Sequence, residues 1–203
     1  ITISELCALT WGSFSFSKTY AGIIVVEIMA ETKLVGDVYR IEELNGPRRR
    51  TIPLPPAVAK FYHRVRDNAP NIQENAPFMR SFKNAARRIR PDEFDRWLKG
   101  FFKSFGFSKQ PELKSLTKNP ERTLRATFRS ALESCGCDAD EIRYLYGSAP
   151  ESVFARNYCA YDDPRELAKL AAVLDKYAIS LTETPCDVSE FKISRKDEDV
   201  VMT

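Results

Sequence analysis

The spacing of apolar residues along this chain changes from a helical period to a strand-like period and back. Residues 1–11 place apolar side chains three or four positions apart, which predicts a short amphipathic helix. Residues 21–54 hold three runs rich in Ile and Val, separated by Gly36 and by the turn at 45–47. From residue 55 onward the period is helical again. The pattern predicts an α+β fold, mainly α-helical, with a small three-stranded antiparallel sheet.

Several of the later helices have clear start and stop signals. Pro55 begins one helix, and Pro91 begins the most regular one, which Gly106 ends. The apolar stripe of this second helix is formed by Phe94, Trp97, Leu98, Phe101, Phe102 and Phe105. Helical spacing of this kind predicts packing in the core, and not a platform for stacking bases. Residues 111–121 read as a polar connector, and Asp163 caps a final helix.

Residues 122–161 read as three short helices in succession. The apolar stripe of the first is formed by Leu124, Phe128, Ala131 and Leu132. This stripe leaves Arg125 off the buried face. A capping box at 138–141 begins the second helix and Gly147 ends it, while Ser148 is a suitable N-cap for the third.

Composition adds few constraints. A chain of 203 residues can bury a core as one domain, and we expect this domain at 1–180 with a C-terminal tail at 181–203. The formal net charge is only +3, so bulk charge does not identify a nucleic-acid partner. The five cysteines and the single histidine form no metal-ligand spacing, so we expect neither a metal site nor a cofactor.

The sequence also bears on location. No apolar run approaches the roughly 20 residues that cross a bilayer, and no signal-peptide pattern is present. We therefore predict a cytoplasmic protein without a membrane partner. The chain has no initiating Met and opens in sequence typical of a domain interior, so we expect a further N-terminal domain upstream.

Three segments resemble the catalytic domain of the tyrosine recombinases, the phage-integrase family. The first box of the family is an Arg followed three residues later by Glu-Leu and then by Leu-x-Trp. Residues 5–11 match it, but Thr2 stands at the arginine position. Residues 50–55 match the strand that ends the sheet of the family. The second box, His-x-x-Arg, matches with Arg122 in place of the histidine and with Arg125 as the arginine.

The resemblance continues to the nucleophile. Residues 146–148 match a Leu-Gly-His turn, with Ser148 in place of the histidine. Tyr158 falls where the nucleophilic tyrosine is expected, and Tyr161 is a less well placed alternative. Members of the family also have a lysine before the closing strand. No lysine is found there, and Lys33 in the preceding turn is the nearest substitute.

The resemblance implies a reaction with double-stranded DNA. In the family the tyrosine attacks a backbone phosphate to form a covalent DNA ester, and arginines and histidines stabilise the phosphate oxygens. Loss of one such donor costs on the order of 10²–10³ in rate. Thr2, Arg122, Ser148 and the missing lysine therefore imply severely reduced cleavage. The resemblance also implies self-association through the C-terminal helix.

Two basic runs are candidate phosphate contacts. They comprise Arg48, Arg49 and Arg50 in the first run and Arg80, Lys83, Arg87, Arg88 and Arg90 in the second, and Lys33 is a further candidate DNA contact. A solvated charged surface is the competing interpretation of both. Three functions follow, in order of preference. The first is a DNA-binding, catalytically impaired integrase domain, and the second is an active recombinase whose missing groups come from Arg122, Lys33 or the arginine run. The third is a helix-turn-helix regulator, which has no use for the predicted sheet.

Overall fold

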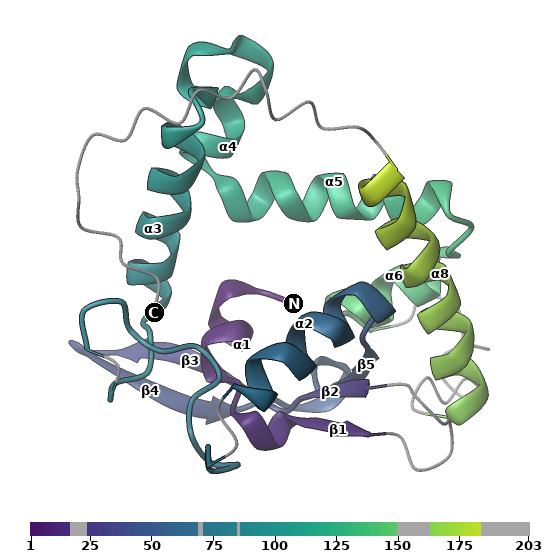
Figure 1. The fold of residues 1–203 in the computed structure, drawn as a ribbon, viewed down its shortest axis with the longest axis horizontal. Coiled ribbons are helices and arrows are strands. Elements are labelled where there is room, and N and C mark those ends of the chain that lie inside the picture. The colour runs from purple at the N-terminus through teal and green to yellow at the C-terminus, as the bar shows by residue number, and fades with distance from the viewer. Residues whose placement is uncertain (17–23, 69–70, 85, 150–162, 184–203) are drawn as a thin grey trace.

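The computed structural model describes residues 1–16, 24–68, 71–84, 86–149 and 163–183. Among these residues, seven α-helices accompany a small antiparallel sheet and a separate hairpin, so the predicted α+β class is confirmed. The helices are α1 (Ile3–Ala8), α2 (Pro56–Asp67), α3 (Pro91–Ser104), α4 (Lys114–Lys118), α5 (Pro120–Ser134), α6 (Ala139–Tyr146) and α8 (Pro164–Glu183). Short 3₁₀ turns are η1 (Trp11–Ser13), η2 (Gly46–Arg48), η3 (Phe107–Lys109) and η4 (Pro111–Leu113). In Figure 1, α5 runs between α4 at one end and α6 and α8 at the other.

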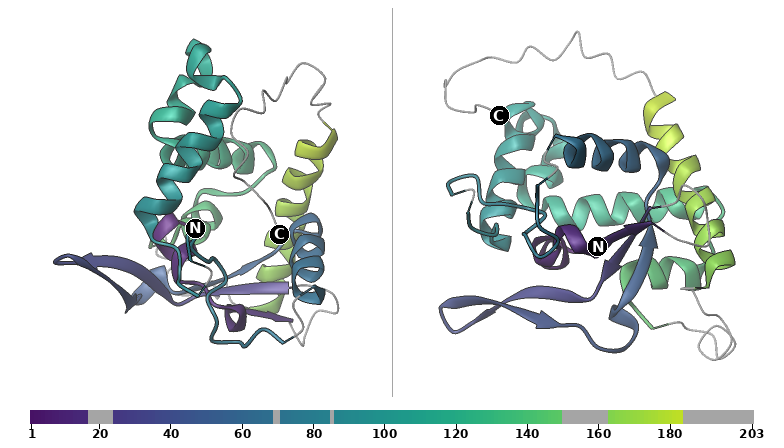
Figure 2. Two further views of the ribbon diagram at one scale, coloured as in Figure 1. Left: turned by 60° about the vertical axis from the view of Figure 1, so that its left-hand side comes forward. Right: turned by 60° about the horizontal axis from the view of Figure 1, so that its bottom comes forward.

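The strands that form the sheet are not all the ones that were predicted. Its order is β1 (Phe14–Phe16), β2 (Ile24–Ile28) and β5 (Arg50–Pro53), all antiparallel. The second predicted run instead forms β4 (Val38–Glu43), which pairs with β3 (Ala30–Val35) in a separate hairpin that projects from the sheet (Figure 2). β1 was not predicted, because three residues are too few to show a period. The hairpin keeps strand-like spacing even though Leu34 and Val38 are exposed.

The core consists of several connected clusters. One cluster joins α5, α6 and α8 through Leu132, Ile142, Leu145, Leu170 and Leu174. Two others join α1, η1 and α2 to the sheet, through Leu9, Val26, Ile28 and Leu44 and through Trp11, Ile24 and Tyr62. Full burial of one such aliphatic side chain contributes about 1.5–3 kcal/mol. Ile52 on β5 packs against both the first and the second cluster, so this strand connects the two halves of the core.

The aromatic helix α3 has the predicted bounds, but its predicted burial is wrong. No residue of α3 is buried, and Trp97 and Phe101 are 41% and 42% exposed. Trp97 stacks on Phe101 with ring centroids 5.4 Å apart and on Phe82 at 5.3 Å. α3 lies at the margin of the molecule and contacts α1, α4 and α5 (Figure 1). Its aromatic side chains therefore contact one another at the surface, an arrangement that spacing alone cannot distinguish from core packing.

Residues 107–134 also depart from the prediction. The expected polar connector contains η4 and the short helix α4. On α5, Leu124 was expected to be inside but is 42% exposed, while Arg125 is half-buried. The inner face of α5 is therefore rotated toward Arg125 at this point. Among the described residues, no helix has both the length and the apolar character needed to cross a membrane.

Candidate functional site

A buried ion pair joins α1 to β5. Arg50 Nη1 and Nη2 donate to Glu5 Oε1 and Oε2 at 3.1 and 2.9 Å, and the two side chains are 0% and 1% exposed. Burial alone would raise the pKa of Glu5, but the hydrogen bonds from Arg50 and from the Thr2 backbone hold this pKa below its ordinary value. A buried charge of this kind requires its partner. Segments 45 positions apart are thereby fixed to each other.

The same guanidinium also binds the C-terminal end of α6. Arg50 Nε donates to the carbonyl of Leu145 at 3.2 Å, and Nη1 donates to the carbonyl of Arg48 at 2.8 Å. Gly147 ends α6 with φ +71°, and a Cβ at this position would lie 2.6 Å from Arg50 Nη1. Glycine is needed here both for its left-handed backbone and for the close approach of the guanidinium.

Two tyrosines of α6 extend these contacts to β5 and α5. The hydroxyl of Tyr144 donates to the carbonyl of Thr51 at 2.8 Å and accepts from its N–H at 3.0 Å. The hydroxyl of Tyr146 donates to the carbonyl of Arg125. The Arg125 guanidinium lies over the Tyr146 ring, 4.6 Å from its centroid, as a cation–π contact. We call this set of contacts among Glu5, Arg50, Gly147, Tyr146 and Arg125 the Arg50 junction.

The first turn of α5 approaches the junction from the side of α1. Ile3 N–H donates to Glu121 Oε1 at 3.2 Å, and Arg122 is the next residue and is exposed. Arg125 Nη1 is buried and has no hydrogen-bond partner among the described residues. Arg50 is buried and bonded to protein acceptors, so the exposed guanidinium of Arg122 beside the junction is the group that suits the binding of an oxygen anion such as a phosphate.

The predicted catalytic residues have different outcomes. Thr2 is the N-cap of α1, where its hydroxyl accepts from the Glu5 N–H at 3.1 Å. Ser148 is exposed and directly follows Gly147, so it lies beside the junction, and its N–H donates to the carbonyl of Arg143. The segments holding Thr2, Arg125 and Ser148 thus meet around Arg50. Tyr158, Tyr161 and the third predicted short helix lie outside the described residues.

Among the residues predicted to contact DNA, Arg50 was assigned the wrong role. Its side chain is completely buried and its donors bind protein acceptors, so it cannot reach a DNA phosphate. Arg49, Arg80 and Lys83 are exposed, as a phosphate contact requires. Their part in DNA binding stays a prediction.

The other predicted contacts already have protein partners. The ion pairs are Lys33 with Glu42 at 3.0 Å, Arg48 with Glu31 at 2.6 Å and Arg87 with Glu93 at 2.8 Å. Arg88 donates through Nη1 to the carbonyls of Cys7 and Leu9, both at 2.8 Å, and burial lowers its pKa. Competing ion pairs weaken the case for Lys33, Arg48 and Arg87 as contacts of a DNA phosphate, although Arg87 Nη1 has no hydrogen-bond partner within the described residues. Arg88 has a structural role in tying its loop to α1.

Sequence reasoning missed the structural roles of Glu5 and Tyr144. Glu5 was identified only as part of a motif, although Thr2 followed three residues later by Glu5 is the sequence signal of the capping box that the structure contains. The Cys7 and Cys137 thiols are buried, and burial raises the pKa of each to about 12, so neither is a reactive thiolate. Within the described part of the chain, no cluster of His, Cys, Asp and Glu could hold a metal ion.

No protein-family model, curated protein or solved structure matches this chain.

Proposed function

We propose that this chain is a DNA-binding domain of the tyrosine-recombinase type in which strand cleavage is greatly reduced. The observation that supports the proposal best is the Arg50 junction. The three segments on which the resemblance depends, 1–11, 50–55 and 122–148, are distant in sequence but contact one another through Glu5, Arg50 and Leu145.

The sheet also favours this proposal over a helix-turn-helix regulator. A three-stranded antiparallel sheet packs against α1 and α2 and contributes Arg50 to the junction. A regulator built on α5 and α6 alone would not need it. The partner under our proposal is double-stranded DNA, with phosphates bound by the exposed arginines near the junction.

Reduced cleavage follows from the identity of the substituted groups. Thr2 is engaged as a helix cap and has no guanidinium to stabilise a pentavalent phosphate. Arg122 is exposed and can contact an anion, but an arginine does not give up its proton as a general base. Each missing donor costs about 10²–10³ in rate, so several losses leave binding as the main activity.

Self-association through the C-terminal helix is part of the proposal, with a restriction. The apolar stripe of α8 is already buried in its own chain, since Leu167, Leu170 and Leu174 are 6%, 0% and 5% exposed. A second protomer would therefore have to contact another face of α8 or the residues that follow it.

DNA binding is tested by fluorescence anisotropy with a labelled duplex over a range of salt concentrations. We expect binding to weaken steeply with salt, and Arg49→Ala and Arg80→Ala to reduce the log–log slope by about 0.9 each. Lys60→Ala on α2 is the matched control, because it removes one exposed positive charge that the proposal does not assign to DNA. The assigned interface would be refuted if all three substitutions changed the salt dependence of DNA binding equally, or if the protein did not bind the duplex at moderate salt.

Cleavage is tested with a nicked suicide substrate, which traps a covalent DNA–protein ester. The proposal predicts binding with little or no trapped product. Efficient trapping that Tyr158→Phe abolishes would instead establish an active recombinase and overturn the claim of impairment.

A further inference from the structure

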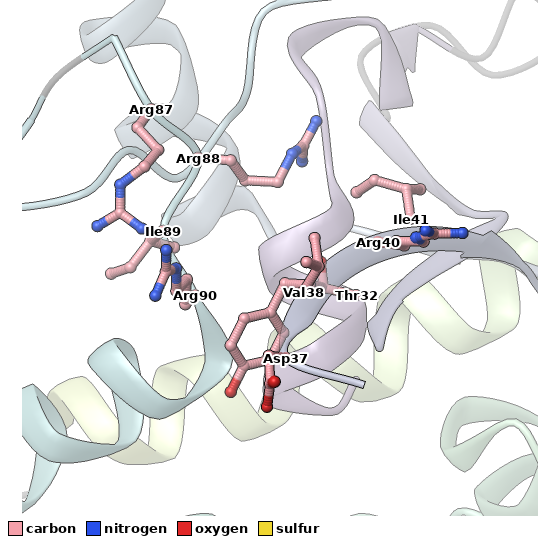
Figure 3. A pocket seen from close by; sticks show the side chains of 10 residues that line it. Thr32, Asp37, Val38, Arg40, Ile41, Arg87, Arg88, Ile89 and Arg90 are labelled. Atoms are coloured by element: carbon pink, nitrogen blue, oxygen red, sulfur yellow. The ribbon is translucent and has the colours of Figure 1, made fainter. Parts of the chain in front are cut away.

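A pocket lies between the β3–β4 hairpin and residues 87–90, away from the contacts of the Arg50 junction. Its volume is about 390 Å³, which is within the range of small-molecule sites. Figure 3 shows Arg87 and Arg90 together on one wall, with Val38 and Thr32 of the hairpin opposite. Arg88 extends between the walls toward α1, where it is held by backbone carbonyls.

Two buried polar groups lining this pocket have no hydrogen-bond partner within the described residues. Thr32 is 5% exposed, and its hydroxyl is unpaired. Arg87 uses Nη2 to bind Ser81 and Glu93, while its Nη1 is unpaired. An unpaired buried polar group is costly, and such groups are uncommon in native proteins. Both atoms have almost no solvent-accessible area, so a ligand can reach them only if neighbouring side chains shift, and its hydrogen-bond acceptors would then pair both.

The charge of the pocket defines the ligand further. Arg40, Arg87, Arg88 and Arg90 line it, and Asp37 is the one acidic residue among the lining residues. Glu93 neutralises Arg87 from outside the lining. Arg90 lies over the Tyr39 ring, 5.8 Å from its centroid, so the arginine is held at the mouth by a cation–π contact. Guanidinium and hydroxyl donors together match the oxygens of a phosphate group.

We propose that this pocket binds a phosphate ester, with Arg87 Nη1, the Arg90 guanidinium and the Thr32 hydroxyl as donors. Tyr39 and Val38 of the hairpin and Ile89 on the opposite side add apolar surface to the pocket, which the group esterified to the phosphate would contact. This group can belong to a free mononucleotide or to a DNA backbone. The inference does not rest on the proposed function, because a free phosphate ester can bind whether or not the chain binds DNA.

The experiment titrates the whole chain with inorganic phosphate, adenosine monophosphate and a short DNA duplex at matched ionic strength. Binding is followed by NMR chemical shifts or calorimetry. The variants are Thr32→Val and Arg90→Gln, and Arg129→Gln on α5 is the control for loss of one exposed positive charge. We expect Thr32→Val and Arg90→Gln each to weaken phosphate-ester binding about tenfold, as loss of a hydrogen bond to a charged group does.

Thr32→Val distinguishes an effect on ligand binding from an effect on protein stability, since it replaces the unpaired hydroxyl with a methyl group of similar size. We expect the free protein to melt at the same temperature or higher, with weaker binding of the ester. Binding of the small probes supports the proposal and identifies a free ligand. Weakened duplex binding alone, specific to the pocket variants, supports it with DNA as the source. If no probe binds, or if pocket and control variants bind equally, the inference is wrong, while DNA binding elsewhere would leave the proposed function intact.

Discussion

The Glu5–Arg50 pair should be one of the largest single contributions to stability in this molecule. The two side chains are 1% and 0% exposed and share two hydrogen bonds of 3.1 and 2.9 Å. Removing one partner of such a pair leaves an uncompensated buried charge and costs about 3–5 kcal/mol. Since domains of this size are stable by about 5–15 kcal/mol, we expect Glu5→Gln to remove a large part of the total.

Glu5→Gln is preferred to Glu5→Leu because it removes the negative charge while it keeps the shape and the hydrogen-bonding oxygen of the side chain. The Thr2 N–H donates to Glu5 Oε2 at 2.8 Å as part of the capping box of α1, and a glutamine oxygen can still accept this bond. Urea denaturation followed by far-UV circular dichroism gives the free energy of unfolding. Glu133→Gln is the control, since its pair with Arg129 is on the exposed face of α5 and should contribute little.

A double-mutant cycle and a pH series complete the test. Combined Glu5→Leu and Arg50→Met should be more stable than either single variant, because no unpaired charge remains. The pKa of Glu5 is held below its ordinary 4.5, so its contribution is present above that value and is lost as the pH falls through the folded-state pKa. The reasoning is refuted if Glu5→Gln costs less than about 1 kcal/mol, or if the double variant is as unstable as the two single losses added.

The remaining predictions concern packing and hydrogen bonds, and each is measured by the same urea denaturation. Gly147→Ala should lower the free energy of unfolding by about 2 kcal/mol or more, because the new Cβ has a strained backbone at φ +71° and also lies 2.6 Å from Arg50 Nη1. Gly36→Ala is the control, since φ is +61° but the space around it is open, and it should show only the backbone cost of about 1 kcal/mol. Leu170→Ala should cost about 2–5 kcal/mol, since this side chain is 0% exposed in the core, and a loss below 1 kcal/mol would contradict the packing of α8. Tyr144→Phe should lower the free energy of unfolding by about 1–3 kcal/mol, because both the N–H and the carbonyl of Thr51 lose the hydroxyl group that binds them.

Features set by neighbouring residues could be predicted from the sequence. The capping box at the start of α6 is present, with Asp138 and Glu141 bonding each other's backbone N–H at 2.8 Å. Gly106 and Gly147 have positive φ at the ends of their helices, as predicted. These features need only a few adjacent positions, and the sequence contains that information directly.

Features that depend on distant partners could not be predicted in this way. Arg50 was assigned to the surface because it stands in a basic run, yet its acceptors come from residues 5 and 145. The aromatic stripe of α3 has the spacing of a core helix, but its burial depends on whether another element covers it. At the candidate site, the resemblance selected segments that do meet, while the role of each arginine needed coordinates.

The arrangement of acceptors around Arg50 has a consequence for biosynthesis. The chain leaves the ribosome from its N-terminal end, so Arg50 can meet Glu5 early, but the Leu145 carbonyl and Gly147 follow almost 100 positions later. Until then the guanidinium lacks part of its coordination and the strand β5 lacks its α6 neighbour. The region around β5 therefore stays incompletely ordered until residues 145–147 have been made, and its native contacts are completed late.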